Sequence, residues 1–192
     1  MYDETRDWIA ANWDESITLR EWWARMLAAR LSFPRWPSEW FGRDCSQRDQ
    51  NDIARAFGDA DVLSAPTGLG VLMGAPVTMT HGTQDQKKRW LPSLADGTEG
   101  WCQLFSEPGA GSDLAGVSCR AERDGDEWVI NGQKIWTSGA LHSSRGMLVA
   151  RSDFDQPKHK GMTYFIINLE QPGVDIRPIK QMNGMAHFNE VF

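Results

Sequence analysis

The period of the hydrophobic pattern changes near Gly97, and this change constrains the fold more than any other feature of the chain. Before it, apolar residues recur at helical spacing, whereas after it short apolar runs alternate with polar residues. Helices followed by strands predict an α+β chain with segregated domains and not a parallel sheet. We expect an all-α helical domain over residues 1–98 and a mostly antiparallel, β-barrel-like domain over residues 99–192.

Helix starts and stops are predicted at several places in the first half. The run 18–31 carries apolar residues at i, i+3, i+4 and i+7, as an amphipathic helix does. Ser46 with Asp49 and Thr83 with Gln86 form capping-box patterns, which predict two further helices.

Two expectations concern the later helices. The segment near residues 69–80 is apolar on nearly every face, so we expect a buried helix there. Because proline cannot donate to the helical ladder, Pro92 is expected to end the helix that Thr83 begins.

The second half contains short runs typical of strands. Two dipeptides, Asp124-Gly125 and Asn131-Gly132, favour the positive φ of two-residue hairpin loops, so residues 117–137 are expected to form an up-and-down meander. The expected strands are residues 101–105, 117–123, 127–130, 134–137 and 162–167.

Charge and composition exclude several classes of function. The net charge is -6 and the basic residues are scattered, so no nucleic-acid partner is expected. The acidic N-terminus lacks an apolar signal region and the longest apolar stretch is broken by Gly74 and Pro76, which favours a cytoplasmic chain without membrane contact. The cysteines, which lack zinc-site spacing, are expected to be buried thiols.

A glycine-rich loop, residues 109–113, follows the first expected strand. Its backbone amides could cradle a phosphate, but the spacing matches no standard phosphate-binding signature, and a plain turn is the alternative. The chemistry of this region must therefore be inferred from its neighbours.

Two segments, Gln103–Gly116 (QLFSEPGAGSDLAG) and Ile130–Gly139 (INGQKIWTSG), closely resemble the flavin-contacting segments of acyl-CoA dehydrogenases. Weaker similarity runs from about residue 18 to the last residue. The resemblance implies FAD as cofactor, with Ser112 also near the acyl-CoA substrate. The residues implied in cofactor binding are Gln103, Phe105, Ser106, Gly111, Ser112, Trp136, Thr137 and Ser138.

The resemblance also implies individual roles. Ser106 and Ser138 would present donors to the polar edge of the isoalloxazine, and Gln103 and Phe105 would line the same shelf. Trp136 would lie against the flavin, with an ordinary core tryptophan as the alternative. Gly111 and Ser112 would lie near the pyrophosphate and the acyl-CoA.

Other polar residues receive structural interpretations. Glu107 and Asp113 are expected to stabilise a turn and are not assigned catalysis. The loop Lys158–Lys160 could approach CoA phosphates, although a solvated loop is favoured. The histidines at 81, 142 and 187 are expected to be structural or at the surface.

The implied reaction is α,β-dehydrogenation of an acyl-CoA thioester to a trans-2-enoyl-CoA, as in fatty acid β-oxidation. The family's catalytic base is a glutamate of a C-terminal helical domain, which lies outside this sequence, so no catalytic residue is assigned within it. We therefore expect the chain alone to bind FAD weakly and to be inactive. An electron-transfer flavoprotein is the expected acceptor, and a homo- or hetero-oligomer is expected for the full-length form.

Rival interpretations remain open. An acyl-CoA oxidase or a flavin monooxygenase relative would share both segments. A non-catalytic scaffold or partner subunit would keep the fold but add no chemistry. A tryptophan-rich carbohydrate-binding module is disfavoured, because half of the chain is predicted to be helical.

Overall fold

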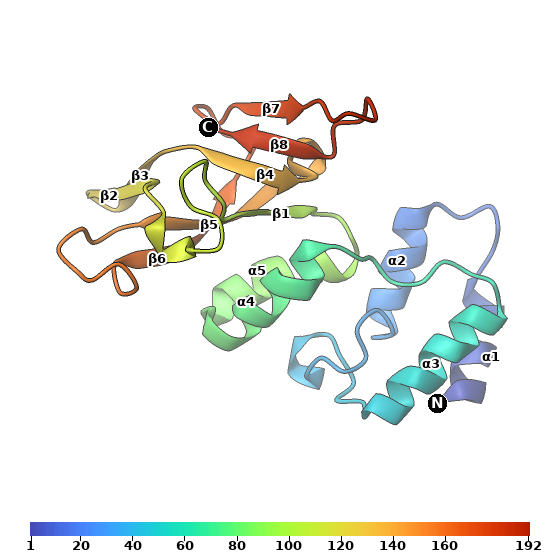
Figure 1. The fold of residues 1–192 in the computed structure, drawn as a ribbon. Coiled ribbons are helices and arrows are strands. Elements are labelled where there is room, and N and C mark those ends of the chain that lie inside the picture. Colours follow the sequence, from blue (N-terminus) through green and yellow to red (C-terminus); the bar gives the residue numbers. More distant parts are fainter. The chain divides into compact units, whose positions relative to one another are not determined.

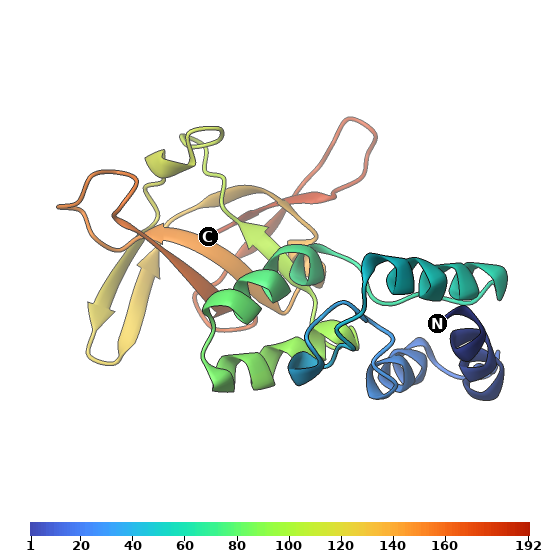
Figure 2. The same ribbon diagram turned by 90° about the horizontal axis from the view of Figure 1, so that it is seen from below.

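A computed structural model describes the whole chain, residues 1–192. The chain divides into two compact units, Met1–Thr98 and Glu99–Phe192, each with its own hydrophobic core. The first is helical and the second is built on strands (Figures 1 and 2), which confirms the α+β class. The helices are α1 (Tyr2–Asn12), α2 (Leu19–Ala28), α3 (Gln47–Asp59), α4 (Ala75–His81) and α5 (Gln84–Ala95), with the 3-10 turn η1 (Ser38–Trp40) and the π-helical turn η2 (Gly70–Gly74).

Capping boxes begin three of the five helices. Ser46 with Asp49 caps α3, and Thr83 with Gln86 caps α5, so both predicted starts are confirmed. Thr18 forms the same arrangement at the start of α2. In each box the N-cap hydroxyl accepts from the backbone N–H three residues later, which satisfies a donor that the helix itself cannot pair.

Trp22 lies at the centre of the helical core. Its side chain is 0% exposed and its indole N–H donates to the carbonyl of Leu63 at 2.6 Å. The rings of Trp8, Trp13 and Phe57 surround it, with centroids 4.9 to 6.1 Å away. Two tryptophans and a phenylalanine of the first unit are therefore packed around a third tryptophan.

Two expectations about the helical unit are wrong. Pro92 lies inside α5, which continues to Ala95 because Leu94 and Ala95 are buried and their packing outweighs the lost backbone bond. The segment 69–80 is a π-helical turn followed by α4, and Leu72 is 71% exposed. An apolar pattern on every face does not specify which face packs inwards.

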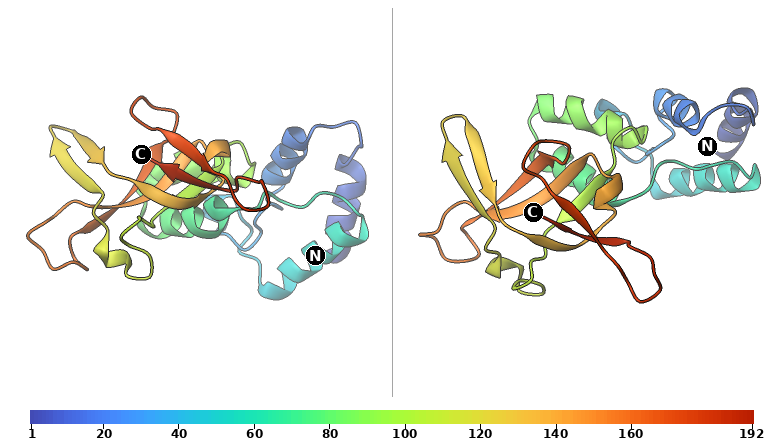
Figure 3. Two further views of the ribbon diagram at one scale, coloured as in Figure 1. Left: turned by 45° about the horizontal axis from the view of Figure 1, so that its top comes forward. Right: turned by 90° about the horizontal axis from the view of Figure 1, so that it is seen from above.

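Two sheets form the second unit (Figure 3). The larger has the order β1-β5-β2-β3, with β6 also paired to β5, and the smaller has the order β4-β8-β7. β5 runs parallel to β1 and β2 and antiparallel to β6. The larger sheet is therefore mixed, whereas the smaller one is antiparallel throughout. Neither closes on itself, so the barrel-like expectation is corrected. The strands are β1 (Trp101–Leu104), β2 (Arg120–Asp124), β3 (Glu127–Asn131), β4 (Lys134–Ser138), β5 (Arg145–Arg151), β6 (Met162–Asn168), β7 (Ile176–Ile179) and β8 (Phe188–Val191).

Only the first half of the predicted meander exists. β2 and β3 form a hairpin whose loop begins at Gly125, with φ at 60°. The chain then passes from β3 to β4, which belongs to the other sheet, so Asn131-Gly132 is not a hairpin loop. Glycine is needed at position 132 because the backbone passes close to Cys119. A Cβ there would lie 2.7 Å from the side chain of Cys119.

No helix is long and apolar enough to span a bilayer.

Candidate functional site

The two segments singled out in the sequence lie side by side in the second unit. The N–H of Ile135 in β4 donates to the carbonyl of Ser106 at 3.0 Å, just beyond β1. The ammonium of Lys134 donates to the carbonyl of Phe105 at 3.0 Å. The loop after β1 is therefore fastened to the beginning of β4.

Glu107 joins three parts of this region through one buried carboxylate. Its Oε1 accepts from Lys134 Nζ at 2.8 Å and from the N–H of Cys119 at 2.9 Å. Its Oε2 accepts from the N–H and the hydroxyl of Ser118, at 2.6 and 2.7 Å. The side chains of Glu107 and Lys134 are 4% and 3% exposed. With both oxygens occupied, this carboxylate organises the loop and is not free to accept a substrate proton.

The charge state of Glu107 follows from these partners. Burial alone would raise the pKa of Glu107, but the hydrogen bonds from Lys134, Ser118 and Cys119 outweigh it and hold that pKa below its ordinary value. Asp113, at the other end of the loop, is exposed and pairs with Lys158 at 2.7 Å, which lowers the pKa of Asp113.

Trp136 occupies an unusual place in β4. Lys134 pairs with Val191 and Thr137 with Asn189, so three steps along β4 oppose two along β8 and β4 carries one extra residue. Trp136 lies within this bulge with φ at 62°, in the left-handed region that a bulky side chain rarely adopts. It is 59% exposed, and its ring lies at a steep angle to that of Phe188, with the two centroids 6.1 Å apart. It is therefore not an ordinary core tryptophan.

The other implied residues differ in exposure. Gln103, Phe105 and Ser106 are half-buried, and Phe105 lies edge-on to Tyr164 at 6.4 Å. Thr137 is 1% exposed, and its carbonyl accepts from the side chain of Asn189, so it lies behind the surface that Trp136 and Ser138 present. The exposed members of the set are Gly111, Ser112, Trp136 and Ser138.

Asn189 and Lys134 were not singled out for any role from the sequence. The side-chain amide of Asn189 donates to the carbonyl of Thr137 at 2.9 Å, and Asn189 is 1% exposed. Lys134 is a lysine inside an expected strand, and Glu107 lies in the other of the two segments. Such a charge at a strand position was the available signal for the buried pair.

The remaining titratable groups form no second centre. Residues 158–160 and the histidines at 81, 142 and 187 are exposed. Cys102 and Cys119 are buried free thiols, as expected, and Cys45 is half-buried. Burial raises the pKa of Cys102 to about 11, so this thiol stays protonated and unreactive at neutral pH.

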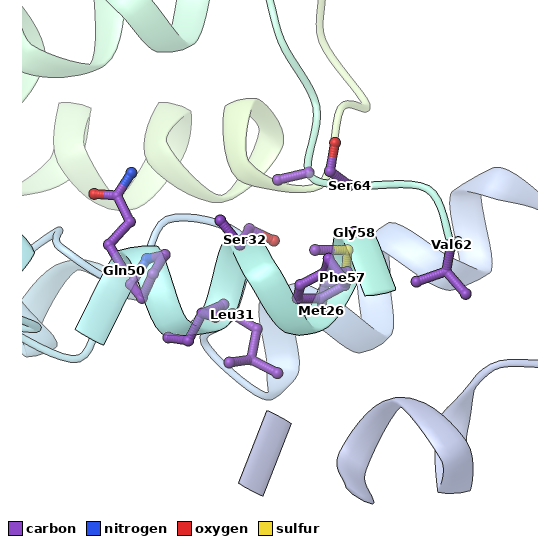
Figure 4. A pocket seen from close by; sticks show the side chains of 12 residues that line it. Met26, Leu31, Ser32, Gln50, Phe57, Gly58, Val62 and Ser64 are labelled. Carbon is purple, nitrogen blue, oxygen red and sulfur yellow. The ribbon is translucent and has the colours of Figure 1, made fainter. Parts of the chain in front are cut away.

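Two cavities lie apart from the residues implied in cofactor binding. One of about 390 Å³ in the helical unit is lined by α3, by Met26 of α2 and by the loops that follow these two helices (Figure 4). The other, of about 340 Å³, lies in the second unit and is lined by Cys119, Trp128 and Lys134 among others. None of the eight implied cofactor residues lines either cavity.

Comparisons with known proteins agree on the relationship of both units. Residues 2–98 match the acyl-CoA dehydrogenase N-terminal domain, and residues 102–191 match the acyl-CoA dehydrogenase middle domain. The acyl-CoA dehydrogenase IpdE1 of Mycobacterium tuberculosis is 45% identical over 173 residues, which are 90% of this chain and 45% of that protein. FadE34 of the same organism is 43% identical over 84% of this chain and 22% of its own length.

Solved structures show the same likeness. A steroid ACAD described as Tcur3481-Tcur3483 has a TM-score of 0.75 at 30% identity, covering all of this chain and 52% of that chain. The ChsE4-ChsE5 complex from Mycobacterium tuberculosis has a TM-score of 0.74 at 30% identity, covering 51% of that chain. The chain spans about half the length of these relatives or less, and it belongs to the acyl-CoA dehydrogenase family.

Proposed function

We propose that this chain provides the flavin-facing part of an enzyme that converts an acyl-CoA thioester to a trans-2-enoyl-CoA. The observation that carries the proposal is the exposed indole of Trp136, held in a left-handed bulge beside Ser138. The whole enzyme needs a base as well, and no carboxylate of the two fastened segments is free for that role, because Glu107 is fully hydrogen-bonded and Asp113 pairs with Lys158.

The residues present fit FAD. The face around Trp136 offers a planar aromatic surface, and the exposed side chain of Ser138 adds a hydroxyl on the same strand. At Gly109 and Gly111 an added Cβ would meet no atom within 4 Å, so the loop leaves open space next to its backbone. A planar ring with a phosphate-bearing tail suits such a combination of aromatic face, hydroxyls and uncovered backbone.

Each residue has a task in this proposal. Bound FAD would supply the acceptor for the β hydride of the substrate. Trp136 would cover one part of the ring and exclude water from it, while Ser106 and Ser138 would donate hydrogen bonds to its polar edge. Gln103 and Phe105 would complete the shelf, and the buried Thr137 would support it from behind. Gly111 and Ser112 would meet the pyrophosphate and the acyl-CoA.

Partners are part of the proposal. A second polypeptide or a further domain supplies the carboxylate base, as the family relationship implies. The likeness to a structure described as the ChsE4-ChsE5 complex supports a heteromeric arrangement, in which this chain is one of two related subunits. An electron-transfer flavoprotein is the proposed acceptor of the electrons.

The proposal is tested by titrating FAD into the purified chain and following the flavin absorbance and fluorescence. We expect saturable binding with quenched fluorescence, and about tenfold weaker binding for Trp136→Ala, the order of one lost stacking contact. Phe154→Ala, which removes another exposed aromatic of the same unit, is the matched control and should leave the affinity unchanged. Equal affinity of both variants and the parent chain would contradict the role of Trp136.

A further inference from the structure

At the bulge in β4, a backbone carbonyl accepts a hydrogen bond from a side chain of β8. Thr137 O accepts from Asn189 Nδ2 at 2.9 Å, and Asn189 stands directly opposite Thr137 in the β4–β8 register. Both residues are 1% exposed. A buried amide therefore holds the backbone immediately after Trp136.

Trp136 needs such a support, because its left-handed backbone is unfavourable for a residue with a Cβ. Such a conformation persists only where the surroundings determine it. On the other side of Trp136, the N–H of Ile135 is bound to Ser106 O at 3.0 Å. The strained residue is thus held on both sides, by the Ser106 carbonyl before it and by Asn189 after it.

The pair is also costly, which indicates a purpose other than stability. Thr137 Oγ1 and Asn189 Oδ1 are both buried and have no hydrogen-bond partner. Two apolar side chains at these paired positions would avoid that cost. The polar pair is explained if the hydrogen bond to Thr137 O determines the backbone conformation.

We infer that Asn189 is a positioning residue, which holds the bulge so that the indole of Trp136 faces the flavin. This inference rests on the proposed function. Asn189 itself is buried in β8 and acts only through the backbone of β4. Its role therefore differs from that of the residues implied in cofactor contact.

Asn189→Leu tests the inference, because leucine has a similar size and no donor. In the chain without FAD, we expect the backbone amide and indole NMR signals of Trp136, assigned with Trp136→Phe, to shift and the Ser138 amide to exchange faster. FAD affinity should fall about tenfold, the order expected for one lost buried hydrogen bond. Asn12→Leu is the control. It removes a 2.8 Å hydrogen bond from a side-chain amide to the carbonyl of Trp8 in α1, and it should change none of these readouts.

The outcomes separate the two claims. Unchanged Trp136 signals in Asn189→Leu overturn the inference, and so do shifted signals with parental FAD affinity. If the parent chain binds no FAD, the proposed function fails and the inference fails with it, while the Trp136 signals of the variant still show whether Asn189 holds the bulge.

A second variant covers the case in which Asn189→Leu does not fold. With Trp136→Gly the left-handed conformation costs little, so the bulge needs less support. We expect Asn189→Ala to shift the urea midpoint of the Trp136→Gly chain by less than half of its shift in the parent chain. An equal shift of the urea midpoint in the parent chain and in Trp136→Gly would show that Asn189 stabilises the fold without supporting Trp136. That result would overturn the inference.

Discussion

At the scale of single residues, buried charge organises the site. Glu107 accepts four hydrogen bonds within a region where both it and Lys134 are almost completely buried. A buried ion pair of this kind is expensive to break, because the remaining partner loses its compensation. Glu107 is thus a structural residue that fastens the loop after β1 to β4.

Glu107→Gln should destabilise the second unit by about 3–5 kcal/mol, because it leaves the buried ammonium of Lys134 without a counter-charge. Urea unfolding followed by circular dichroism measures the change. Asp113→Asn is the matched control, since its pair with Lys158 is exposed and screened by water, and its loss should be much smaller. Equal losses for the two variants would contradict the role assigned to burial.

The lowered pKa of Glu107 predicts an acid dependence of stability. A carboxylate whose pKa is lower in the folded chain stabilises that state above the unfolded pKa of roughly 4.3, and this contribution disappears as the pH falls through the folded pKa. The difference in unfolding free energy between the parent chain and Glu107→Gln should therefore be largest at pH 7. It should shrink as the pH falls below the unfolded pKa of roughly 4.3. A difference that stays constant down to pH 2 would refute it.

At the scale of elements, the step from β3 to β4 decides the arrangement of the second unit. The hairpin between β2 and β3 was predictable, because Gly125 marks its loop locally. The crossing at Gly132 was not, since a glycine needed for close approach has the same sequence signal as a glycine needed for a turn. The strands β5, β7 and β8 were also not singled out, although β5 is the central strand that pairs with three others.

Gly132→Ala is expected to destabilise the second unit by about 1–3 kcal/mol, the range of overpacking substitutions. The new Cβ would lie 2.7 Å from the Cys119 side chain and 2.8 Å from its Cα, so the backbone itself must shift. Thermal unfolding compares it with Gly109→Ala, where a Cβ meets nothing within 4 Å. Equal melting temperatures of the two variants would show that the backbone at Gly132 tolerates a side chain.

At the scale of the whole molecule, two cores share no residue. The helical core is centred on Trp22, whereas the core of the second unit contains Cys102, Leu148 and other residues of the strands. The family models follow the same division, with one covering residues 2–98 and the other residues 102–191. Each unit therefore corresponds to one of the two matches.

Trp22→Ala should cost about 3–5 kcal/mol, since it removes a fully buried ring and its three aromatic neighbours lose their contact. Hydrogen exchange read by mass spectrometry should show lost protection in α1, α2 and α3, with the strands of the second unit retaining theirs. Trp136→Ala, at an exposed ring, is the comparison that should leave the helices protected. Loss of protection throughout the chain would show instead that the units unfold together.

The sequence by itself determined what depends on near neighbours along the chain. The helix starts at Ser46 and Thr83, the loop at Gly125 and the two family segments all follow from residues a few positions apart. Tertiary structure alone decided what depends on distant residues: the pairing of Glu107 with Lys134, the passage of Gly132 beside Cys119 and the support of Trp136 by Asn189. These contacts join residues that only the folded sheets bring together, so no local pattern could encode them.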